Sequence, residues 1–147
     1  MQIVQTGIGS IGNIEKVLNN YDVSRILLVT GRKSFDSSGA KAALGASLRD
    51  YKVTHFDDFD INPKLNDAKK GAELAIKNAI ELVICVGGGS VIDMAKLIKA
   101  LYANISKADS LAKGLTDIID PSIPIIAIPT TAGSGSESTH FAVVYIG

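Results

Sequence analysis

The feature that most constrains this chain is the alternation of short apolar runs with amphipathic stretches. Apolar runs with the length of β-strands occur at residues 26–29, 52–56, 82–86 and 123–128. Between and after them, helical spacing of apolar residues occurs at 13–20, 39–49, 64–79 and 90–102, with a shorter stretch at 109–115. Strands that alternate with helices in this way predict an α/β fold, with a mostly parallel sheet covered by helices on both faces.

Composition narrows the class of protein further. A chain of 147 residues, 46% of them hydrophobic, can bury one core, so we expect a single domain over residues 1–147. Fifteen basic residues balance fifteen acidic ones, which argues against nucleic acid and anionic membranes as partners. We see no secretory signal and no apolar run of the ~18 residues that span a membrane, so we expect a soluble, cytoplasmic protein.

The run at 82–86 is apolar throughout, which predicts a central strand covered on both faces. It contains the chain's single cysteine, Cys85, which cannot form an internal disulfide. We interpret this thiol as buried and inert.

A glycine-rich segment at 86–96, VGGGSVIDMAK, directly follows this strand and opens a helical pattern. Glycines let the backbone approach a ligand without Cβ clashes, and the first amides of the helix can donate to a phosphate. Open α/β sheets bind such ligands at the carboxyl ends of their strands. The alternative is a helix cap made by Ser90, with Asp93 completing the capping box and pairing with Lys96.

A second loop, 128–137, reads IPTTAGSGSE and follows the next predicted strand. Its hydroxyls and glycine amides can replace the hydration of a phosphate or ribose. The alternative interpretation is a polar surface loop.

The segment GIGSIG at 7–12 matches the dinucleotide-binding fingerprint letter for letter. That fingerprint also needs an acidic residue about twenty positions later, at the end of the next strand, to hold the ribose. The next predicted strand is followed by Gly31, Arg32 and Lys33 instead. We therefore favour the loop at 86–96 as the nucleotide site.

The two later motifs closely resemble the hallmarks of the iron-containing alcohol dehydrogenase family, which read GGGSxxDxAK and PTTAGTGSE. Ser134 stands in place of the threonine of the second motif. The similarity covers essentially the whole chain, including a glycine-containing strand and turn like 6–12 and an Asn-Pro pair like Asn62-Pro63. It implies the Rossmann-like NAD(P)-binding N-terminal domain of a longer two-domain architecture. Residues 30–35, followed by 38–40, also resemble a branch that reduces phosphonoacetaldehyde.

The resemblance implies specific cofactor contacts. The pyrophosphate would lie on the glycine loop, the second loop would line the cofactor beyond it, and Asp93 would face the nicotinamide end; no residue is assigned a certain catalytic role. The implied cofactor-binding residues are Gly31, Asn62, Gly88, Gly89, Ser90, Asp93, Thr130, Thr131, Gly133, Ser134 and Val143, the last on a closing strand.

Gly31 marks a departure from the family pattern. Many relatives carry at this position an Asp that binds the adenosine ribose and repels a 2′-phosphate. Its loss, with Arg32 and Lys33 next to it, leads to the hypothesis that NADPH is tolerated or preferred. The alternative is that these cations are solvated surface residues.

The family's iron(II) ligands, an Asp and several His residues, belong to a helical C-terminal domain that this sequence lacks. His55 and His140 are interpreted as partly exposed structural histidines, so no metal ligand is assigned. We expect nucleotide binding, no turnover from this chain alone, a small alcohol or aldehyde as the family's substrate, and self-association of any exposed apolar surface.

Other classes of protein stay open at this point. Dehydroquinate synthase and glycerol-1-phosphate dehydrogenase have similar glycine loops but not the second motif. A stand-alone nucleotide-binding regulatory or partner-docking module is the non-enzymatic alternative. That alternative predicts a polar surface where a second domain would pack, whereas the run 141–146 is apolar.

Overall fold

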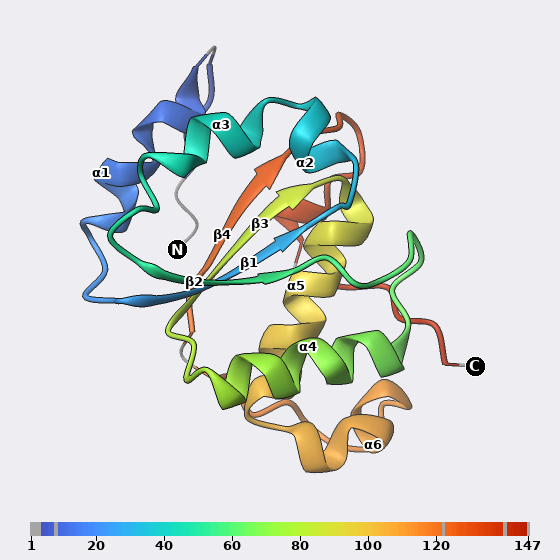
Figure 1. Ribbon diagram of the computed structural model, residues 1–147. Coiled ribbons are helices and arrows are strands. Elements are labelled where there is room, and N and C mark those ends of the chain that lie inside the picture. The colour runs from blue at the N-terminus through green and yellow to red at the C-terminus, as the bar shows by residue number, and fades with distance from the viewer. Residues whose placement is uncertain (1–3, 8, 122, 140, 147) are drawn as a thin grey trace.

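A four-stranded, all-parallel sheet forms the centre of the molecule (Figure 1). The computed structural model describes residues 4–7, 9–121, 123–139 and 141–146. The strands are β1 (Arg25–Thr30), β2 (Lys52–Phe56), β3 (Leu82–Gly87) and β4 (Ile125–Pro129), in the order β2-β1-β3-β4. The predicted α/β class and parallel sheet are confirmed.

Helices connect these strands. They are α1 (Ile14–Leu18), α2 (Ser34–Ser37), α3 (Ala40–Gly45), α4 (Leu65–Lys77), α5 (Gly89–Tyr102) and α6 (Ala108–Ala112), with short 3-10 turns η1 (Ser10–Asn13), η2 (Ile105–Lys107) and η3 (Ser136–Ser138). The five predicted helices correspond to α1, α3, α4, α5 and α6, while α2 was not predicted. Among the described residues, no helix is long and apolar enough to cross a membrane.

Helices cover the sheet on both faces because alternate strand residues point to opposite sides. On one face, Leu27, Val29 and Val83 pack with residues of α4 and α5. On the other, Ile26 and Leu28 pack with residues of α1 and α3. Every residue of β3 is buried, which confirms its predicted central place.

The strand order creates a topological switch point. The chain leaves β1 for β2 on one side and then returns to place β3 on the other side of β1. The loops after β1 and β3 therefore diverge at their carboxyl ends, and open α/β sheets bind ligands in the crevice this leaves. Gly31 follows β1 there, and Gly88 follows β3.

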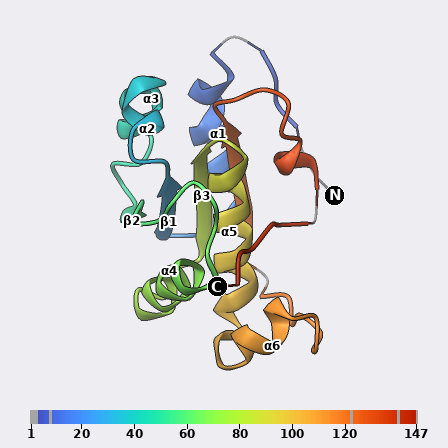
Figure 2. The same cartoon turned by 90° about the vertical axis from the view of Figure 1, so that its right-hand side faces the viewer.

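Two terminal segments differ from the sequence-based prediction. The apolar run 141–146 is not a strand; Tyr145 makes an isolated bridge with Lys64, donating to the carbonyl of Pro63 and accepting from the amide of Leu65. Its apolar side chains gain no sheet neighbour, because the segment runs along α5 towards α4 (Figure 2). Near the other end, the described residues of 6–12 form turns and η1 rather than a strand.

Candidate functional site

The glycine loop brings the start of α5 to the carboxyl edge of the sheet. Gly88 is the N-cap of α5, and its backbone is extended. Its carbonyl accepts from the amides of Val91 and Ile92, at 3.1 and 3.2 Å. The amides of Gly89 and Ser90 precede these first helical bonds and are the donors that a helix leaves for a ligand.

The capping hypothesis for Ser90 is wrong. Ser90 is the second residue inside α5 and not its cap, and no side chain caps this helix. A glycine in the N-cap position leaves the amides of the first turn without a competing side-chain acceptor. This arrangement favours an external anion at the helix start.

The hydroxyl loop follows β4 and lies beside the glycine loop. It is anchored by Thr130, whose amide donates to the carbonyl of Gly87 at 3.0 Å. Gly133 and Gly135 have left-handed φ values of 92° and 65°, which glycine adopts without steric cost. The loop therefore turns back sharply towards the start of α5.

The two loops approach too closely for side chains at the glycines. A Cβ on Gly88 would lie 3.1 Å from Oγ1 of Thr131. A Cβ on Gly89 would lie 3.1 Å from Cβ of Ser134 and 3.2 Å from Oγ of Ser136. The predicted pyrophosphate loop and the predicted hydroxyl loop thus form one continuous surface.

One hydroxyl at this surface lacks a partner. Oγ1 of Thr130 is buried, and in the described part of the chain it has no hydrogen-bond partner. A buried, unsatisfied hydroxyl costs about 1–3 kcal/mol, so its retention calls for an explanation. A ligand oxygen seated between the two loops would supply the missing bond.

Asp93 and Lys96 lie on the next turns of α5 and contact the end of the hydroxyl loop and the segment after it. The Asp93 carboxylate accepts from the amide of Val143 at 3.4 Å. Lys96 donates to the carbonyls of Ser136 and Phe141 at 2.5 and 2.8 Å. The suggested pairing of Lys96 with Asp93 is therefore wrong, because both side chains bind this segment instead.

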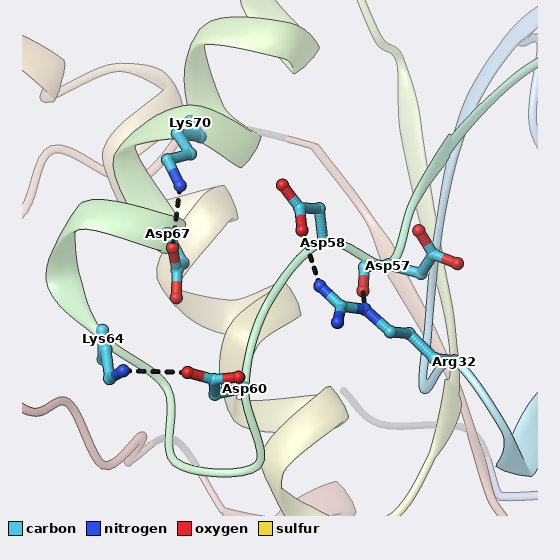
Figure 3. A network of polar contacts seen from close by, with 7 residues as sticks. All are labelled: Arg32, Asp57, Asp58, Asp60, Lys64, Asp67 and Lys70. Carbon is cyan, nitrogen blue, oxygen red and sulfur yellow. Dashed lines mark hydrogen bonds and ion pairs between the residues drawn. The ribbon is translucent and has the colours of Figure 1, made fainter.

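Gly31 lies at the end of β1, where the family pattern places an acidic residue. A Cβ at Gly31 would lie 3.6 Å from Val91 of α5 and would contact Oγ of Ser34 at the start of α2. Beside it, Arg32 donates from Nη2 to Asp58 at 2.6 Å and from Nε to the carbonyl of Asp57 at 3.2 Å (Figure 3). Arg32 is therefore paired rather than simply solvated.

Both partners of this ion pair are largely exposed, with 58% of the Arg32 side chain and 75% of the Asp58 side chain accessible. Exposed pairs contribute roughly 0–1 kcal/mol, so an incoming phosphate could displace Asp58. Further along the same loop, Lys64 donates to Asp60 at 2.8 Å (Figure 3). That bond and the charge of Lys64 hold the pKa of Asp60 below its usual value.

The structure does not bring all predicted residues into contact. Asn62 lies exposed on the loop between β2 and α4. Within the described part of the chain it makes no hydrogen bond to any other predicted cofactor-binding residue. Val143 is 58% exposed and lies outside any strand, so its predicted place on a closing strand is wrong. The assignment of both residues to the cofactor stays a prediction.

The described residues contain no group of three or more His, Cys, Asp or Glu side chains that could hold a metal ion. His55 is exposed, its Nε2 lies 2.7 Å from Oγ1 of the buried Thr30, and its ring packs against Phe35. These contacts fit the structural role predicted for it. His140 lies outside the described residues.

A hollow of about 620 Å³ lies at the opposite, amino edge of the sheet. Its lining is mostly apolar and includes Tyr21, Ile80 and Tyr102. Two carboxylates, Asp22 and Glu81, also line it. Glu81 is engaged by the amides of Ser24 and Arg25 and by the Arg25 guanidinium. No glycine, lysine or arginine lines this hollow among the described residues, so the carboxyl edge is the stronger candidate for a phosphate-bearing ligand.

Sequence reasoning missed the role of Lys96 and the pairing of Arg32. The motif itself signals that Lys96 lies one turn beyond Asp93 on the same helix. What the sequence lacks is the path of residues 136–143, because a loop's course depends on tertiary contacts. No local pattern could have supplied these partners.

Comparison with known proteins matches the chain to one family model, described as iron-containing alcohol dehydrogenase, over residues 2–147. A long-chain primary alcohol dehydrogenase of Thermoanaerobacter ethanolicus is 34% identical over 95% of this chain and 36% of its own length. The chain thus spans about a third of the length of the curated relatives it matches.

Solved structures agree with this match. A sulfoacetaldehyde reductase from Bifidobacterium kashiwanohense, in complex with NAD+, superimposes with a TM-score of 0.81 at 28% identity, over 95% of this chain and 42% of that one. An NADH-dependent butanol dehydrogenase from Thermotoga maritima gives a TM-score of 0.80 at 27% identity, over 88% of this chain and 33% of that one.

Proposed function

The chain belongs to the iron-containing alcohol dehydrogenase family, and from this premise we propose that residues 1–147 form its NAD(P)-binding domain. In this proposal the whole protein transfers hydride between a nicotinamide cofactor and a small alcohol or aldehyde. A bound nicotinamide ring supplies or accepts the hydride. The residues of this chain hold the dinucleotide at the carboxyl edge of the sheet.

The observation that carries the proposal is the shared surface of the two loops. The amides of Gly89 and Ser90 offer donors for a pyrophosphate, and the closeness of Thr131 to Gly88 explains why no side chain fits there. In this proposal a ligand oxygen also bonds the buried Oγ1 of Thr130, which has no partner among the described residues. These features match the chemistry of a dinucleotide, which presents phosphate and ribose oxygens.

The remaining predicted contacts are part of the proposal. In it, Gly31 and Asn62 flank the adenosine, while Gly133 and Ser134 continue the lining beyond the pyrophosphate. Asp93 and Val143 border the nicotinamide end. The resemblance to a phosphonoacetaldehyde-reducing branch stays a prediction.

The iron site is a different matter, because the described residues do not fit it. Among them there is no group of three or more His, Cys, Asp or Glu side chains, whereas a catalytic metal site needs three or more protein ligands. We propose that the ligands come from outside residues 1–147, and we assign no step at the metal to residues described here.

Titration with NADH, followed by fluorescence, tests nucleotide binding. We expect saturable binding, and Thr130→Val should weaken it by about five- to tenfold, since the valine removes one hydroxyl that bonds the ligand. Thr54→Val, which removes a hydroxyl from the middle of β2, is the matched comparison for loss of a threonine hydroxyl. Absence of saturable NADH and NADPH binding up to about 1 mM would exclude the proposed function.

Cofactor preference needs its own experiment. We propose that NADPH is tolerated or preferred, because Gly31 presents no carboxylate and Arg32 can exchange Asp58 for a 2′-phosphate. Asp58→Asn should then lower the NADPH dissociation constant and leave that for NADH unchanged. Equal dissociation constants for the two cofactors would remove the case for a preference.

The stand-alone regulatory or docking module is less well supported. It predicts a polar surface around the end of the described chain, yet Phe141 is 85% exposed and Ile146 is 52% exposed. Apolar side chains exposed together favour burial against further protein. This surface suits a second domain or a second copy of the chain better than solvent.

A further inference from the structure

Lys96 binds the middle of α5 to the end of the hydroxyl loop and to the residues that follow it. Its ammonium donates to the carbonyl of Ser136 at 2.5 Å and to that of Phe141 at 2.8 Å. It also donates to Oγ1 of Thr139 at 3.1 Å. Because an ammonium has three N–H donors, these three acceptors satisfy all of them.

The acceptors come from a stretch without regular structure apart from η3. Thr139 in turn donates from Oγ1 to the carbonyl of Phe141 at 3.3 Å, so the acceptors are linked to one another. Hydrogen bonds to a charged group contribute more than neutral ones, and here they replace the ladder that a strand would provide. The ammonium of Lys96 thus holds Ser136, Thr139 and Phe141 at one point on α5.

Asp93 adds a second attachment one turn earlier on α5. Its carboxylate accepts from the amide of Val143 at 3.4 Å. Residues three apart lie on the same face of a helix, so Asp93 and Lys96 hold the segment from one side. The segment therefore moves with α5.

The contacts of Lys96 also affect the surface that the two loops share. Ser136, whose carbonyl binds Lys96, also places its Oγ 3.2 Å from the position of a Cβ on Gly89. Ser134 in the same loop accepts from the amide of Ser136 at 3.5 Å. A shift of Ser136 would therefore carry the hydroxyl loop away from the start of α5.

We infer that Lys96 is a positioning residue that holds the hydroxyl loop against the glycine loop and so preorganises the dinucleotide cradle. It acts through Ser136, Thr139 and Phe141 and not by contact with phosphate, because its three N–H donors are already engaged. The inference rests on the proposed function, and it assigns to the motif's lysine a role distinct from that of its glycines.

Proteolysis tests the attachment without any cofactor, in the protein at its natural length. Lys96→Met removes all three donors, so a Glu-specific protease should cleave after Glu137 about tenfold faster than in wild type. Lys99→Met is the control: Lys99 lies one turn further along α5 and pairs at 3.1 Å with Asp120, whose side chain is 75% exposed. An unchanged cleavage rate in Lys96→Met overturns the inference.

A double-mutant cycle tests positioning against a simple electrostatic role. Thr131→Val should weaken NADH binding when it is introduced into the wild-type protein. In the Lys96→Met protein, Thr131→Val should change the free energy of NADH binding by less than about half as much, because the loop is already displaced. Additive effects, or an equal effect of Lys99→Met, overturn positioning. Absence of NADH binding to wild type instead overturns the proposed function, and the cofactor role of Lys96 with it.

Lys96→Arg is a second variant, needed in case Lys96→Met fails to fold. Arginine keeps the charge and several donors, so it should restore slow cleavage after Glu137 and most of the NADH affinity. If Lys96 instead contacted the phosphate directly, its removal would make NADH binding less dependent on salt concentration. We expect the same dependence in Lys96→Met as in wild type, and a weaker dependence contradicts the inference.

Discussion

At the scale of single residues, Gly89 shows how closely the cradle is built. A methyl group there would lie 3.1 Å from Cβ of Ser134, which belongs to a loop held by backbone and lysine contacts. We predict that Gly89→Ala raises the NADH dissociation constant about tenfold while changing the free energy of unfolding by less than about 1 kcal/mol. Fluorescence titration and urea unfolding measure the two quantities.

Gly45→Ala is the matched control for that substitution. Gly45 is exposed at the end of α3, and a Cβ there would meet no heavy atom within 4 Å. It should leave NADH binding unchanged and stabilise the fold slightly, through helix propensity. Equal NADH affinities of Gly89→Ala and wild type would contradict the close packing of the loops.

Glu81 predicts a pH dependence of stability. The amides of Ser24 and Arg25 donate to its carboxylate at 2.8 and 3.0 Å, and the Arg25 charge adds to their effect. These contacts hold the pKa of Glu81 below its usual 4.5 in the folded state. Its stabilising effect is therefore complete above that value and is lost as pH falls through the folded pKa.

We expect Glu81→Gln to unfold at lower urea concentration than wild type at pH 7. The difference should shrink as pH falls below 4.5 and through the lowered pKa of the folded state, because the wild-type carboxyl then also becomes protonated. Urea midpoints across this pH range check the prediction. A difference that is constant from pH 7 to pH 3 would show that the carboxylate's charge is not responsible.

Residue roles were predictable where burial or backbone freedom dictates them. Cys85 was expected to be buried and inert; it is fully buried, and burial raises the pKa of its thiol to about 12. Gly88 and Gly89 were assigned from their place between a strand and a helix. The partners of Lys96 and Arg32 were not predictable, because long side chains reach groups that are distant in sequence.

At the scale of elements, α4 and α5 meet through a glycine. Gly71 is buried in α4, and a Cβ on it would collide with Ile98 of α5 and lie 3.0 Å from the Phe56 ring. We predict that Gly71→Ala destabilises the fold by about 1–3 kcal/mol, although alanine is the better helix former. Gly45→Ala again supplies the control, and a stabilised Gly71→Ala would show that Ile98 moves aside freely.

Regular elements were predicted well where periodicity is strong. The strand at 52–56 has the predicted bounds, and α5 begins one residue before its predicted start. β4 begins at Ile125 rather than at residue 123, because Pro124 has no N–H to donate to the sheet. The four residues of α2 are too few to show a helical period, so they were missed.

The apolar run 141–146 shows the limit of pattern reasoning. An apolar run predicts burial, and a strand is one way to achieve it. Here the residues run along α5, where Asp93 and Lys96 bind their backbone groups. Phe141 and Val143 stay 85% and 58% exposed, so the pattern was correct about apolarity but not about structure.

At the scale of the whole molecule, parallel strands alone predict that the loops after β1, β3 and β4 lie at one edge. The sequence could not give the strand order β2-β1-β3-β4, which places the switch point between β1 and β3. That order determines which loops flank the crevice. With this order, the glycine loop lies between Gly31 on one side and the hydroxyl loop on the other.

The last prediction separates binding from turnover. The cradle for a dinucleotide is formed within residues 1–147, whereas the described residues offer no cluster of metal-binding side chains. We therefore predict that a fragment of residues 1–147 binds NADH but fails to reduce simple aldehydes when iron(II) is added, since the described residues hold no group of three or more metal-binding side chains. NADH absorbance follows turnover, with the protein at its natural length as the positive control. Iron-dependent NADH oxidation by the fragment would place the metal site within these residues and refute the division of roles.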